Sequence, residues 1–307
     1  MAYPHDGIVL IDKDEGESSF SVVKRVKRIL GVKKAGHAGT LDPFATGLLV
    51  VLLGQGTKLS SYLMAGGKTY RATLRLGVET DTIDPTGRVV RTRPVPVFKP
   101  EYIKEKASGF IGEIEQVPPA FSALKYEGKR AYKLARKGIQ VALRKRKVKI
   151  HHLEIISFDL PEVTILVACS GGTYIRSLAD DMGKALGSGA HLRALKRLSV
   201  GSFSVKDALR SGEMELGPHE SPLQDRIIAL RDAIPDMEEA QVDAWTAQKI
   251  RKGYQPKYED LHKELPLPDH YAGDMKLVKG TELVAIVKTS WDLNAGESWS
   301  KVVRVFH

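Results

Sequence analysis

The stretch GHAGTLDPFATGLLVVLLG, from Gly36 to Gly54, restricts the possible folds of this chain more than any other segment. Its first half is rich in glycine and polar residues and carries one acid, Asp42, directly before Pro43. Its second half contains the wholly apolar run Leu48–Leu53. Such a run predicts a buried strand, and the proline favours extended geometry at Asp42. The stretch therefore places one carboxylate at the entrance of a buried strand, either as a turn former or as a reactive group.

The elements on either side of this stretch mix strands and helices. Residues 19–30 combine an apolar stripe with a basic face, which predicts an amphipathic helix that ends at Gly31. Residues 68–78 alternate apolar and polar side chains as a strand does, and residues 100–114 predict a further helix. A doubly wound fold would need regular alternation of strand and helix, which this order lacks. We therefore expect an α+β fold with a mixed, mostly antiparallel sheet.

A change of pattern after Pro235 predicts a second unit. A short helix over 240–251 and a proline-rich loop over 256–268 are followed by two strand-like segments, KLVKGTELVAIVKTSWD and SKVVRVFH. We expect a large domain over residues 1–235 and a small β-rich module over residues 236–307.

The charge of the chain is unevenly distributed. The formal net charge is +10, yet residues 236–307 contain 10 Lys/Arg and 12 Asp/Glu. Residues 1–235 therefore carry 37 basic and 25 acidic side chains. A basic body of this kind favours a polyanionic partner, usually nucleic acid. The alternative is a solvated basic surface that only maintains solubility.

The sequence predicts a soluble, cytoplasmic protein. Its single cysteine, Cys169, excludes an internal disulfide and fits a reducing compartment. The first residues lack the basic segment and long apolar segment of a secretory leader. The run Leu48–Leu53 is far shorter than the roughly 20 residues that span a bilayer, so we expect no association with a membrane.

Patterns that could indicate a bound nucleotide or metal fail on spacing. GGKTY at residues 66–70 resembles the end of a phosphate loop, but Tyr62 stands where that loop requires a glycine. One cysteine provides no zinc-binding pair. The adjacent acids Asp180 and Asp181 diverge on a helix. We therefore reject the phosphate loop and expect no metal site.

The segment GHAGTLDPFATGLL closely resembles the signature of the TruB family of tRNA pseudouridine synthases, which reads G-H-x-G-T-L-D-P-x-A-x-G-x-L. Further segments resemble other blocks of the family in the same order: KTYRATLRLGVETDTIDPTG, QVPPAFSALKYEGKRAYKLARKG, CSGGTYIRSLADDMG and GAHLRALKRLSVGSF. Together these segments cover most of residues 7–204. One departure is Asp14, because the family usually reads D-K-P-x-G-x-[ST]-S and has proline at that position.

The resemblance implies the catalytic fold of pseudouridine synthases, with an RNA-binding thumb insertion at about residues 116–150 and a PUA-like C-terminal module. It implies isomerisation of uridine to pseudouridine at position 55 in the TΨC loop of tRNA. In this reaction the nucleotide is flipped out of its loop, and a C1′–C5 bond replaces the C1′–N1 bond. No metal, cofactor or guide RNA is implied, and we expect a monomer.

The resemblance also assigns roles to residues of the site. Asp42 matches the catalytic aspartate, which is a nucleophile at C1′ or the pyrimidine ring, or a base in a glycal route. Arg176 matches the arginine that pairs with this carboxylate; its alternative is a surface pair with Asp180. Tyr70 matches the tyrosine that stacks on the base and assists removal of the C5 proton; its alternative is an ordinary buried aromatic. Tyr174 and Leu195 match residues that line the uracil pocket. His37 matches a histidine that takes part in flipping the nucleotide out of its loop.

The thumb and the basic run that follows it are expected to hold the RNA backbone. RNA loops of this kind are recognised through shape and phosphates more than through base edges. The side chains that we expect to contact phosphates are Lys125, Lys129, Arg130, Arg144, Lys145, Arg146 and Lys147. The alternative for the run is a solvated loop.

Two other functions share this scaffold. One is a non-catalytic tRNA-binding or tRNA-folding protein, against which the intact Asp42, Tyr70 and Arg176 argue. The other is a guide-RNA-dependent relative that works inside a ribonucleoprotein. The long thumb segment and the lack of a lysine-rich tail favour the stand-alone enzyme.

Overall fold

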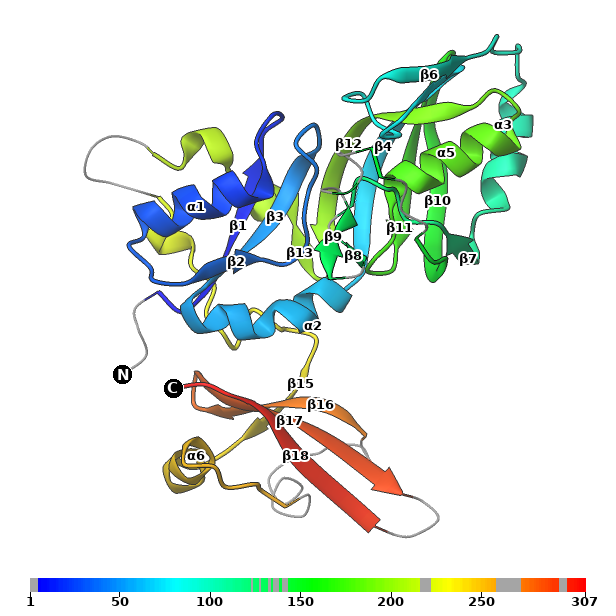
Figure 1. The fold of residues 1–307 in the computed structure, drawn as a ribbon. Coiled ribbons are helices and arrows are strands. Elements are labelled where there is room, and N and C mark those ends of the chain that lie inside the picture. Colours follow the sequence, from blue (N-terminus) through cyan, green and yellow to red (C-terminus); the bar gives the residue numbers. More distant parts are fainter. Residues whose placement is uncertain are drawn as a thin grey trace.

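The computed structural model describes residues 5–122, 124–126, 128–131, 134, 138–139, 143–215, 222–257, 272–292 and 297–307. One large sheet forms the body of the molecule (Figure 1). Its strands run in the order β14 (Leu209–Arg210), β1 (Gly7–Lys13), β3 (Thr46–Leu53), β12 (Ala190–Val200), β4 (Lys68–Leu76), β11 (Glu162–Cys169), β10 (Arg146–Asp159) and β7 (Gly112–Gln116). Two short strands are added at the sides, β2 (Ala35–His37) on β3 and β13 (Phe203–Ser204) on β12.

The pairing in this sheet confirms the predicted fold class. Neighbouring strands are antiparallel except for two parallel pairs, β1 with β14 and β3 with β12. Helices are inserted between the strands: α1 (Ser19–Ile29), α2 (Ser60–Ala65), α3 (Pro100–Ser108) and α5 (Ile175–Ala185). Short 3₁₀ helices cover Gly54–Leu59, Val205–Asp207, Ser211–Glu213 and Gln224–Arg226. The chain is therefore an α+β protein with a mixed, mostly antiparallel sheet.

Strand β3 explains the continuous apolar run of the sequence, because both of its faces are covered. Alternate side chains of a strand point to opposite faces. Leu49, Val51 and Leu53 belong to the core beneath α1, α3 and α5. Leu48, Val50 and Leu52 belong to a second core, which includes residues of α2 and of the C-terminal module. A strand covered on both faces has no polar side to present to water.

The helix predicted over 100–114 is shorter than expected. Helix α3 ends at Ser108, and Gly112–Gln116 form strand β7, which pairs with Arg146–Ile150. Gly112 has a φ of 106°, a conformation outside the helical region. The sequence GEIEQ then alternates in burial as an edge strand does. Helix α3 therefore ends before the predicted residue 114, and the chain continues as a strand from Gly112.

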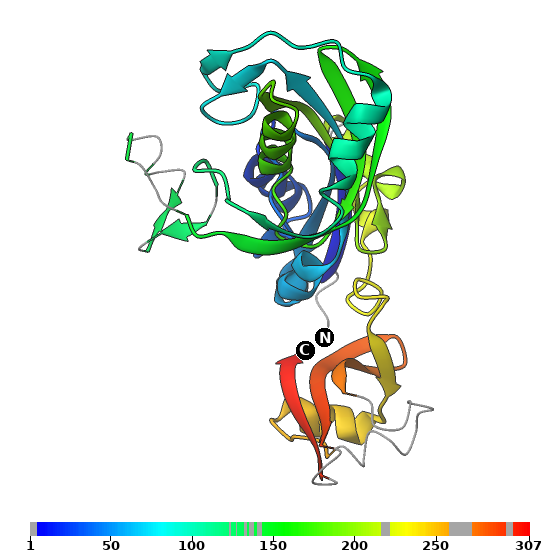
Figure 2. The ribbon, with the colours of Figure 1, turned by 90° about the vertical axis from the view of Figure 1, so that its right-hand side faces the viewer.

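Two hairpins extend from the large sheet. The first joins β5 (Val78–Thr80) to β6 (Val89–Thr92). The second pairs β8 (Lys125–Tyr126) with β9 (Lys129–Arg130) in the segment between β7 and β10. Figure 2 shows this second hairpin projecting from the body, on the side of the sheet where α1 and α5 lie.

The C-terminal residues form a small β-rich module, as predicted. Its sheet runs in the order β15 (Glu238–Gln241), β16 (Gly273–Lys279), β17 (Glu282–Asp292) and β18 (Glu297–Val305). The helix expected from residue 240 begins later, as α6 (Ala244–Arg251), because Glu238–Gln241 pair with β16 and the Asp243 carboxylate caps the helix at the Thr246 amide.

The module packs directly on the body. Phe306 belongs to the second core, and Lys58 donates a 2.6 Å hydrogen bond to the Val305 carbonyl. Within the described ranges, no helix has the length and apolar character needed to cross a membrane.

Candidate active site

Asp42 lies in the loop between β2 and β3, with 32 % of its side chain exposed. The residue before it is fixed to α1. The buried Ser19 hydroxyl donates to the Leu41 carbonyl at 2.9 Å and accepts from the Leu41 amide at 2.8 Å. Ser18 meanwhile caps the helix by accepting a hydrogen bond from the Ser21 amide. The two adjacent serines of the sequence therefore have different tasks, and Ser19 holds the loop that carries Asp42 in place.

Arg176 binds both oxygens of the Asp42 carboxylate through two nitrogens of its guanidinium group. Nε lies 3.0 Å from Oδ2 of Asp42, and Nη2 lies 3.3 Å from Oδ1. Arg176 comes from the first turn of α5 and is 5 % exposed. The alternative partner, Asp180, pairs with Lys184 at 2.6 Å. The structure thus joins two residues that are 134 positions apart in the sequence.

A second carboxylate, Asp84, shares this guanidinium and was missed by the sequence analysis. Nη1 of Arg176 lies 3.1 Å from Oδ2 of Asp84, whose side chain is 6 % exposed. Thr86 donates to Oδ1 of Asp84 through its amide at 3.0 Å and its hydroxyl at 2.6 Å. Ile83, which precedes Asp84, has a φ of 61°, and no other non-glycine residue among those described has a positive φ. Strain of this kind is typical of functional loops. The available signal was the second Asp-Pro pair of the chain.

The environment raises the pKa of Asp42 above its ordinary value. Burial is the main cause, and the nearby charge of Asp84 acts in the same direction. The positive charges of Arg176 and Lys13 oppose the shift but do not cancel it. The guanidinium of Arg176 therefore offsets only part of the effect of burial on the pKa of Asp42.

Tyr70 and Arg197 face each other across the sheet close to Asp42. Tyr70 on β4 is directly opposite Arg197 on β12 in the strand register and is 7 % exposed. Burial raises the pKa of the Tyr70 phenol; the Arg197 charge lowers it, and the Asp42 charge raises it. The phenol is therefore held in its neutral form at neutral pH.

Arg197 fixes the two ends of the Asp42 loop, a role that the sequence analysis did not identify. Its guanidinium is 1 % exposed and donates to the carbonyls of Leu48 at 2.7 Å and Gly39 at 3.0 Å. Strand β3 can approach Arg197 because Gly47 has no side chain, since a Cβ atom there would lie 2.3 Å from the Arg197 carbonyl oxygen. Gly47 of the opening stretch is therefore required for the close approach of β3 to the main chain of Arg197.

His37 is the last residue of β2 and carries a buried polar atom. Nδ1 of its ring has no hydrogen-bond partner within the described part of the chain. Burial, and next the charge of Arg197, lower the pKa of the ring. A neutral imidazole with an unused ring nitrogen is typical of a functional position rather than of a satisfied core histidine.

The two residues expected to line the pocket come from β12 and from the start of α5. Leu195 on β12 is 8 % exposed and belongs to the same core as Tyr70. Tyr174 directly precedes α5, and its main chain is held by Gln116, which accepts from the Tyr174 amide at 3.0 Å and donates to its carbonyl at 3.2 Å. Both side chains are supplied by elements that also carry Arg176 or Arg197.

The basic run Arg144–Lys147 lies where β10 begins. Arg144, Lys145 and Lys147 are exposed, and Lys145 lies 3.5 Å from the Glu115 carboxylate. Arg146 is different, since its guanidinium lies 5.7 Å from the centroid of the Tyr174 ring. Part of the run therefore belongs to strand β10 and contacts Tyr174, where the sequence analysis also allowed a solvated loop.

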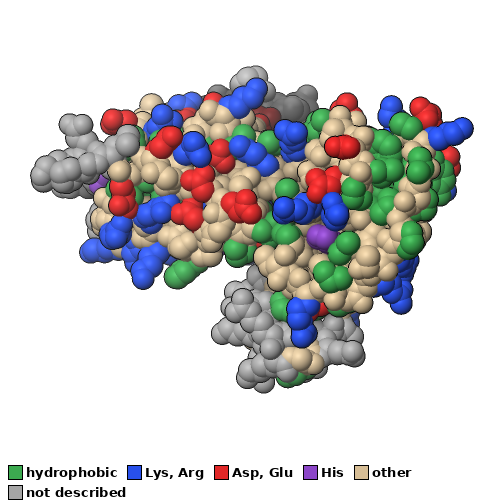
Figure 3. Space-filling model, turned by 90° about the horizontal axis from the view of Figure 1, so that it is seen from above, with side chains coloured by type: hydrophobic (Ala, Val, Ile, Leu, Met, Phe, Trp, Pro, Cys, Tyr) green, Lys and Arg blue, Asp and Glu red, His purple; other side chains and the backbone are tan. Residues whose placement is uncertain are grey.

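The β8–β9 hairpin, the surface charges and the metal-binding side chains concern a possible RNA partner or metal ion. The main chains of Lys125, Lys129 and Arg130 form the β8–β9 hairpin, and their side chains lie outside the described part of the structure. Figure 3 shows acidic and basic side chains interspersed over the middle of the upper face of the body. The described residues contain no group of three or more His, Cys, Asp or Glu side chains that could hold a metal ion.

Known families and proteins match this chain along most of its length. Residues 27–175 match the N-terminal domain of TruB family pseudouridylate synthases, and residues 176–241 match the tRNA pseudouridylate synthase B C-terminal domain. The tRNA pseudouridine synthase B of Geobacter sulfurreducens is 40% identical over 310 residues, covering 98% of this chain and 100% of that protein. That of Desulfotalea psychrophila is 52% identical over 214 residues, covering 68% and 87%.

The fold has a match among solved structures. The crystal structure of a Cbf5–Nop10–Gar1 complex contains a chain with a TM-score of 0.76 and 25% identity, covering 99% of this chain and 86% of that one. Fold, site and matches together define a pseudouridine synthase, an enzyme that isomerises uridine to pseudouridine. Within this class the chain belongs to the TruB family, which modifies tRNA. The family predicted from the opening stretch is therefore confirmed.

Proposed function

We propose that this enzyme isomerises uridine 55 in the TΨC loop of tRNA, with Asp42 as its catalytic carboxylate. The observation that carries the proposal is the two-armed pair between Asp42 and Arg176. The guanidinium is buried, while a third of the carboxylate side chain is open to a substrate. A buried arginine that holds a partly exposed carboxylate fixes its orientation and favours its ionised form.

In the proposed reaction one glycosidic bond replaces another without an external reagent. Asp42 assists cleavage of the C1′–N1 bond by adding to C1′, by adding to the pyrimidine ring, or by removing a proton from the sugar. The base then turns, C5 bonds to C1′, the proton on C5 is lost, and N1 gains a proton. Arg176 keeps the Asp42 carboxylate in one orientation throughout.

Tyr70 is proposed to stack on the flipped base. Its raised pKa keeps the phenol neutral, and this favours stacking over removal of the C5 proton. Extrusion of a nucleotide costs a few kcal/mol, and stacking on an aromatic side chain returns about 1–3 kcal/mol per base. His37, neutral and beside the same loop, is proposed to support the extruded nucleotide.

Backbone contacts supply the rest of the binding energy in this proposal. The thumb at residues 116–150 and the exposed Arg144, Lys145 and Lys147 would hold phosphates, while Arg146 orders Tyr174 at the pocket. We further propose that the large domain extends over residues 1–235, that the module over 236–307 is PUA-like, and that the enzyme acts as a monomer, without a guide RNA, in the cytoplasm, where its tRNA substrate resides.

Release of tritium from tRNA labelled at C5 of uracil tests the proposal. The wild-type protein should release tritium from bare tRNA, and Asp42→Asn should not. Asp180→Asn is the matched control, because it neutralises a carboxylate that pairs with Lys184 on the outer side of α5. A tRNA with cytidine at position 55 should give no release. Normal release by Asp42→Asn would overturn the role of Asp42, and release from the cytidine-55 tRNA would overturn the position.

A further inference from the structure

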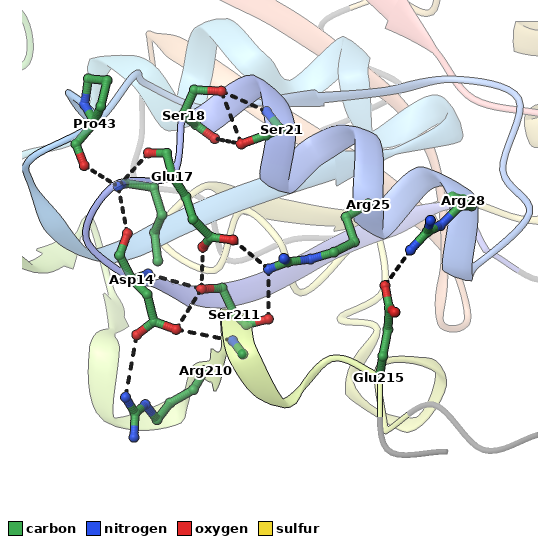
Figure 4. Close-up of polar contacts among 12 residues, drawn as sticks. Asp14, Glu17, Ser18, Ser21, Arg25, Arg28, Pro43, Arg210, Ser211 and Glu215 are labelled. Carbon is green, nitrogen blue, oxygen red and sulfur yellow. Dashed lines mark hydrogen bonds and ion pairs between the residues drawn. The ribbon is translucent and has the colours of Figure 1, made fainter. Parts of the chain in front are cut away.

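Asp14, which stands where the TruB signature usually has proline, ties the end of β1 to the segment after β14. Its amide donates to the Ser211 hydroxyl oxygen at 2.9 Å. Its carboxylate accepts from the Ser211 hydroxyl at 2.9 Å, from the Gly212 amide at 3.1 Å and from Arg210 at 3.4 Å (Figure 4). This is a dense set of contacts for a turn residue, and it joins positions that are 197 residues apart.

Glu17 closes the same turn from its other end. Its carboxylate accepts from the Ser211 hydroxyl and pairs with Arg25 at 2.8 Å. Arg25 in turn donates to the Ser211 carbonyl at 2.7 Å. Ser211 is 2 % exposed, and its single hydroxyl proton serves one of the two carboxylates at a time. The positive charges of Arg25 and Arg210 balance Asp14 and Glu17, so the cluster is neutral in sum.

The turn held in this way presents two donors to the catalytic loop. The Gly16 amide donates to the Pro43 carbonyl at 2.8 Å, and the Lys13 ammonium group donates to the same oxygen at 3.3 Å. Lys13 is fully buried and also donates to the carbonyls of Asp14 at 2.9 Å and Glu17 at 2.8 Å. Pro43 directly follows Asp42, so the backbone on that side of the carboxylate is fixed by the turn.

We propose that Asp14 and Ser211 are positioning residues for Asp42, because their hydrogen bonds hold the turn that carries Lys13 and Gly16 against Pro43. In this proposal the hydrogen bonds of Asp14 restrict the backbone of the turn, as the ring of a proline at the same position would. The inference rests on the proposed catalytic role of Asp42. It adds a connection from the active site to β14, at the far edge of the large sheet.

The hydrogen-bonding groups of Asp14 provide the first test. Asp14→Ala should lower kcat for tritium release about tenfold and leave KM for tRNA unchanged, since small displacements of reacting groups cost up to ~100-fold. The positive charge of Lys13 lowers the pKa of Asp42, and this effect weakens when Lys13 is no longer held in place. The pKa of Asp42 should therefore rise, and the acid limb of the kcat profile should move to higher pH. Ser211→Ala should have the same effects, and the double variant should be no worse than either single variant.

Asp14→Pro tests whether kcat depends on a restricted turn backbone or on the contacts of the Asp14 side chain themselves. The ring restricts the backbone of the turn, so this variant should recover most of the kcat lost in Asp14→Ala. Adding Ser211→Ala to Asp14→Pro should then lower kcat less than Ser211→Ala does in the wild type, because only the hydrogen bond of Ser211 to Glu17 remains to be lost.

Arg28→Ala is the matched control, because Arg28 lies on α1, the helix that also carries Arg25. Arg28 pairs with Glu215 at 2.5 Å on the surface and makes no contact with the turn (Figure 4). Its removal should leave kcat and the acid limb as in the wild type. If Asp14→Ala and Ser211→Ala lower the melting temperature but keep wild-type kcat and acid limb while folded, the network is only structural and the inference is wrong. If Asp42→Asn is itself active, the proposed active site fails instead.

Discussion

Asp42 and Asp84 bind the same arginine but lie in different surroundings. Each carboxylate belongs to an Asp-Pro pair in a loop between two strands, and both lie about 3 Å from the Arg176 guanidinium. The side chain of Asp84 is 6 % exposed, and it is hydrogen-bonded by Arg176, Thr82 and Thr86. The side chain of Asp42 is 32 % exposed, with the guanidinium on its buried side.

The difference assigns a task to each carboxylate. A buried, fully hydrogen-bonded carboxylate can orient a cation but cannot reach a substrate, whereas an exposed one beside the same cation can do both. The negative charge of Asp84 also raises the pKa of Asp42, and this makes the reactive carboxylate more basic. In the proposed mechanism, Asp84 therefore orients Arg176 and Asp42 acts on the substrate.

The largest effect is expected from Asp42→Asn, which should lower kcat by at least about 10³-fold because removal of a group that acts on the substrate is rarely compensated. The free energy of unfolding of Asp42→Asn should not fall with kcat. The folded state raises the pKa of Asp42, so its contribution to stability is complete at low pH and is lost as pH rises through that pKa. Urea unfolding at neutral pH should show a variant as stable as the wild type or more so, with the difference vanishing in acid. A less stable variant at neutral pH would contradict this account.

Arg176→Lys should have the second-largest effect. Lysine keeps the charge but cannot bind two carboxylates and the Phe121 carbonyl at once. We expect kcat to fall about 100-fold through misplacement of Asp42 and stability to fall by roughly 1–3 kcal/mol through unsatisfied buried groups. Arg75→Lys is the control, because Arg75 makes an exposed 3.7 Å pair with Glu162 and should change stability by less than about 1 kcal/mol. If Arg176→Lys and Arg75→Lys changed kcat and the free energy of unfolding equally, the burial of Arg176 would not explain its effect.

The sequence predicted one of these two carboxylates and missed the other. Asp42 was identified because an apolar run and a family signature surround it. Asp84 lies in a turn-rich loop where acids are common for local reasons. Its importance comes from Arg176, which is 92 residues away in the sequence, and no local pattern encodes that contact.

The fold shows the same limit. Strand β3 was predicted because its burial leaves a continuous apolar run, and the mixed sheet followed from the order of elements. Arg197 and Lys13 were not predicted as buried residues, since isolated charged residues are normally exposed. Both are buried because backbone carbonyls of distant loops satisfy them, as with Gly39 and Pro43. Such partners are set by tertiary structure alone.

Asp84→Asn should have a moderate effect that differs in kind from the first two. The amide can still accept a hydrogen bond from Thr86 but attracts Arg176 less, so we expect kcat to fall about tenfold, or roughly 1.4 kcal/mol. The acid limb of the kcat profile should move to lower pH, because the charge that raises the pKa of Asp42 is gone. This shift is opposite to the one expected for Asp14→Ala. An acid limb that moves to higher pH in Asp84→Asn would show that Asp84 does not act on Asp42 through its charge.

The smallest effect is expected from Thr86→Val, which removes one of the donors to Asp84. The Thr86 amide remains 3.0 Å from the carboxylate after the 2.6 Å hydroxyl contact is lost. Loss of one hydrogen bond should cost about 1 kcal/mol in the free energy of unfolding and lower kcat by roughly twofold to threefold. Thr86→Ser restores the hydroxyl and is the matched control. If Thr86→Val lowered kcat as much as Asp84→Asn, the geometry of Asp84 rather than its charge would control Arg176, and the division of tasks between the two carboxylates would have to be redrawn.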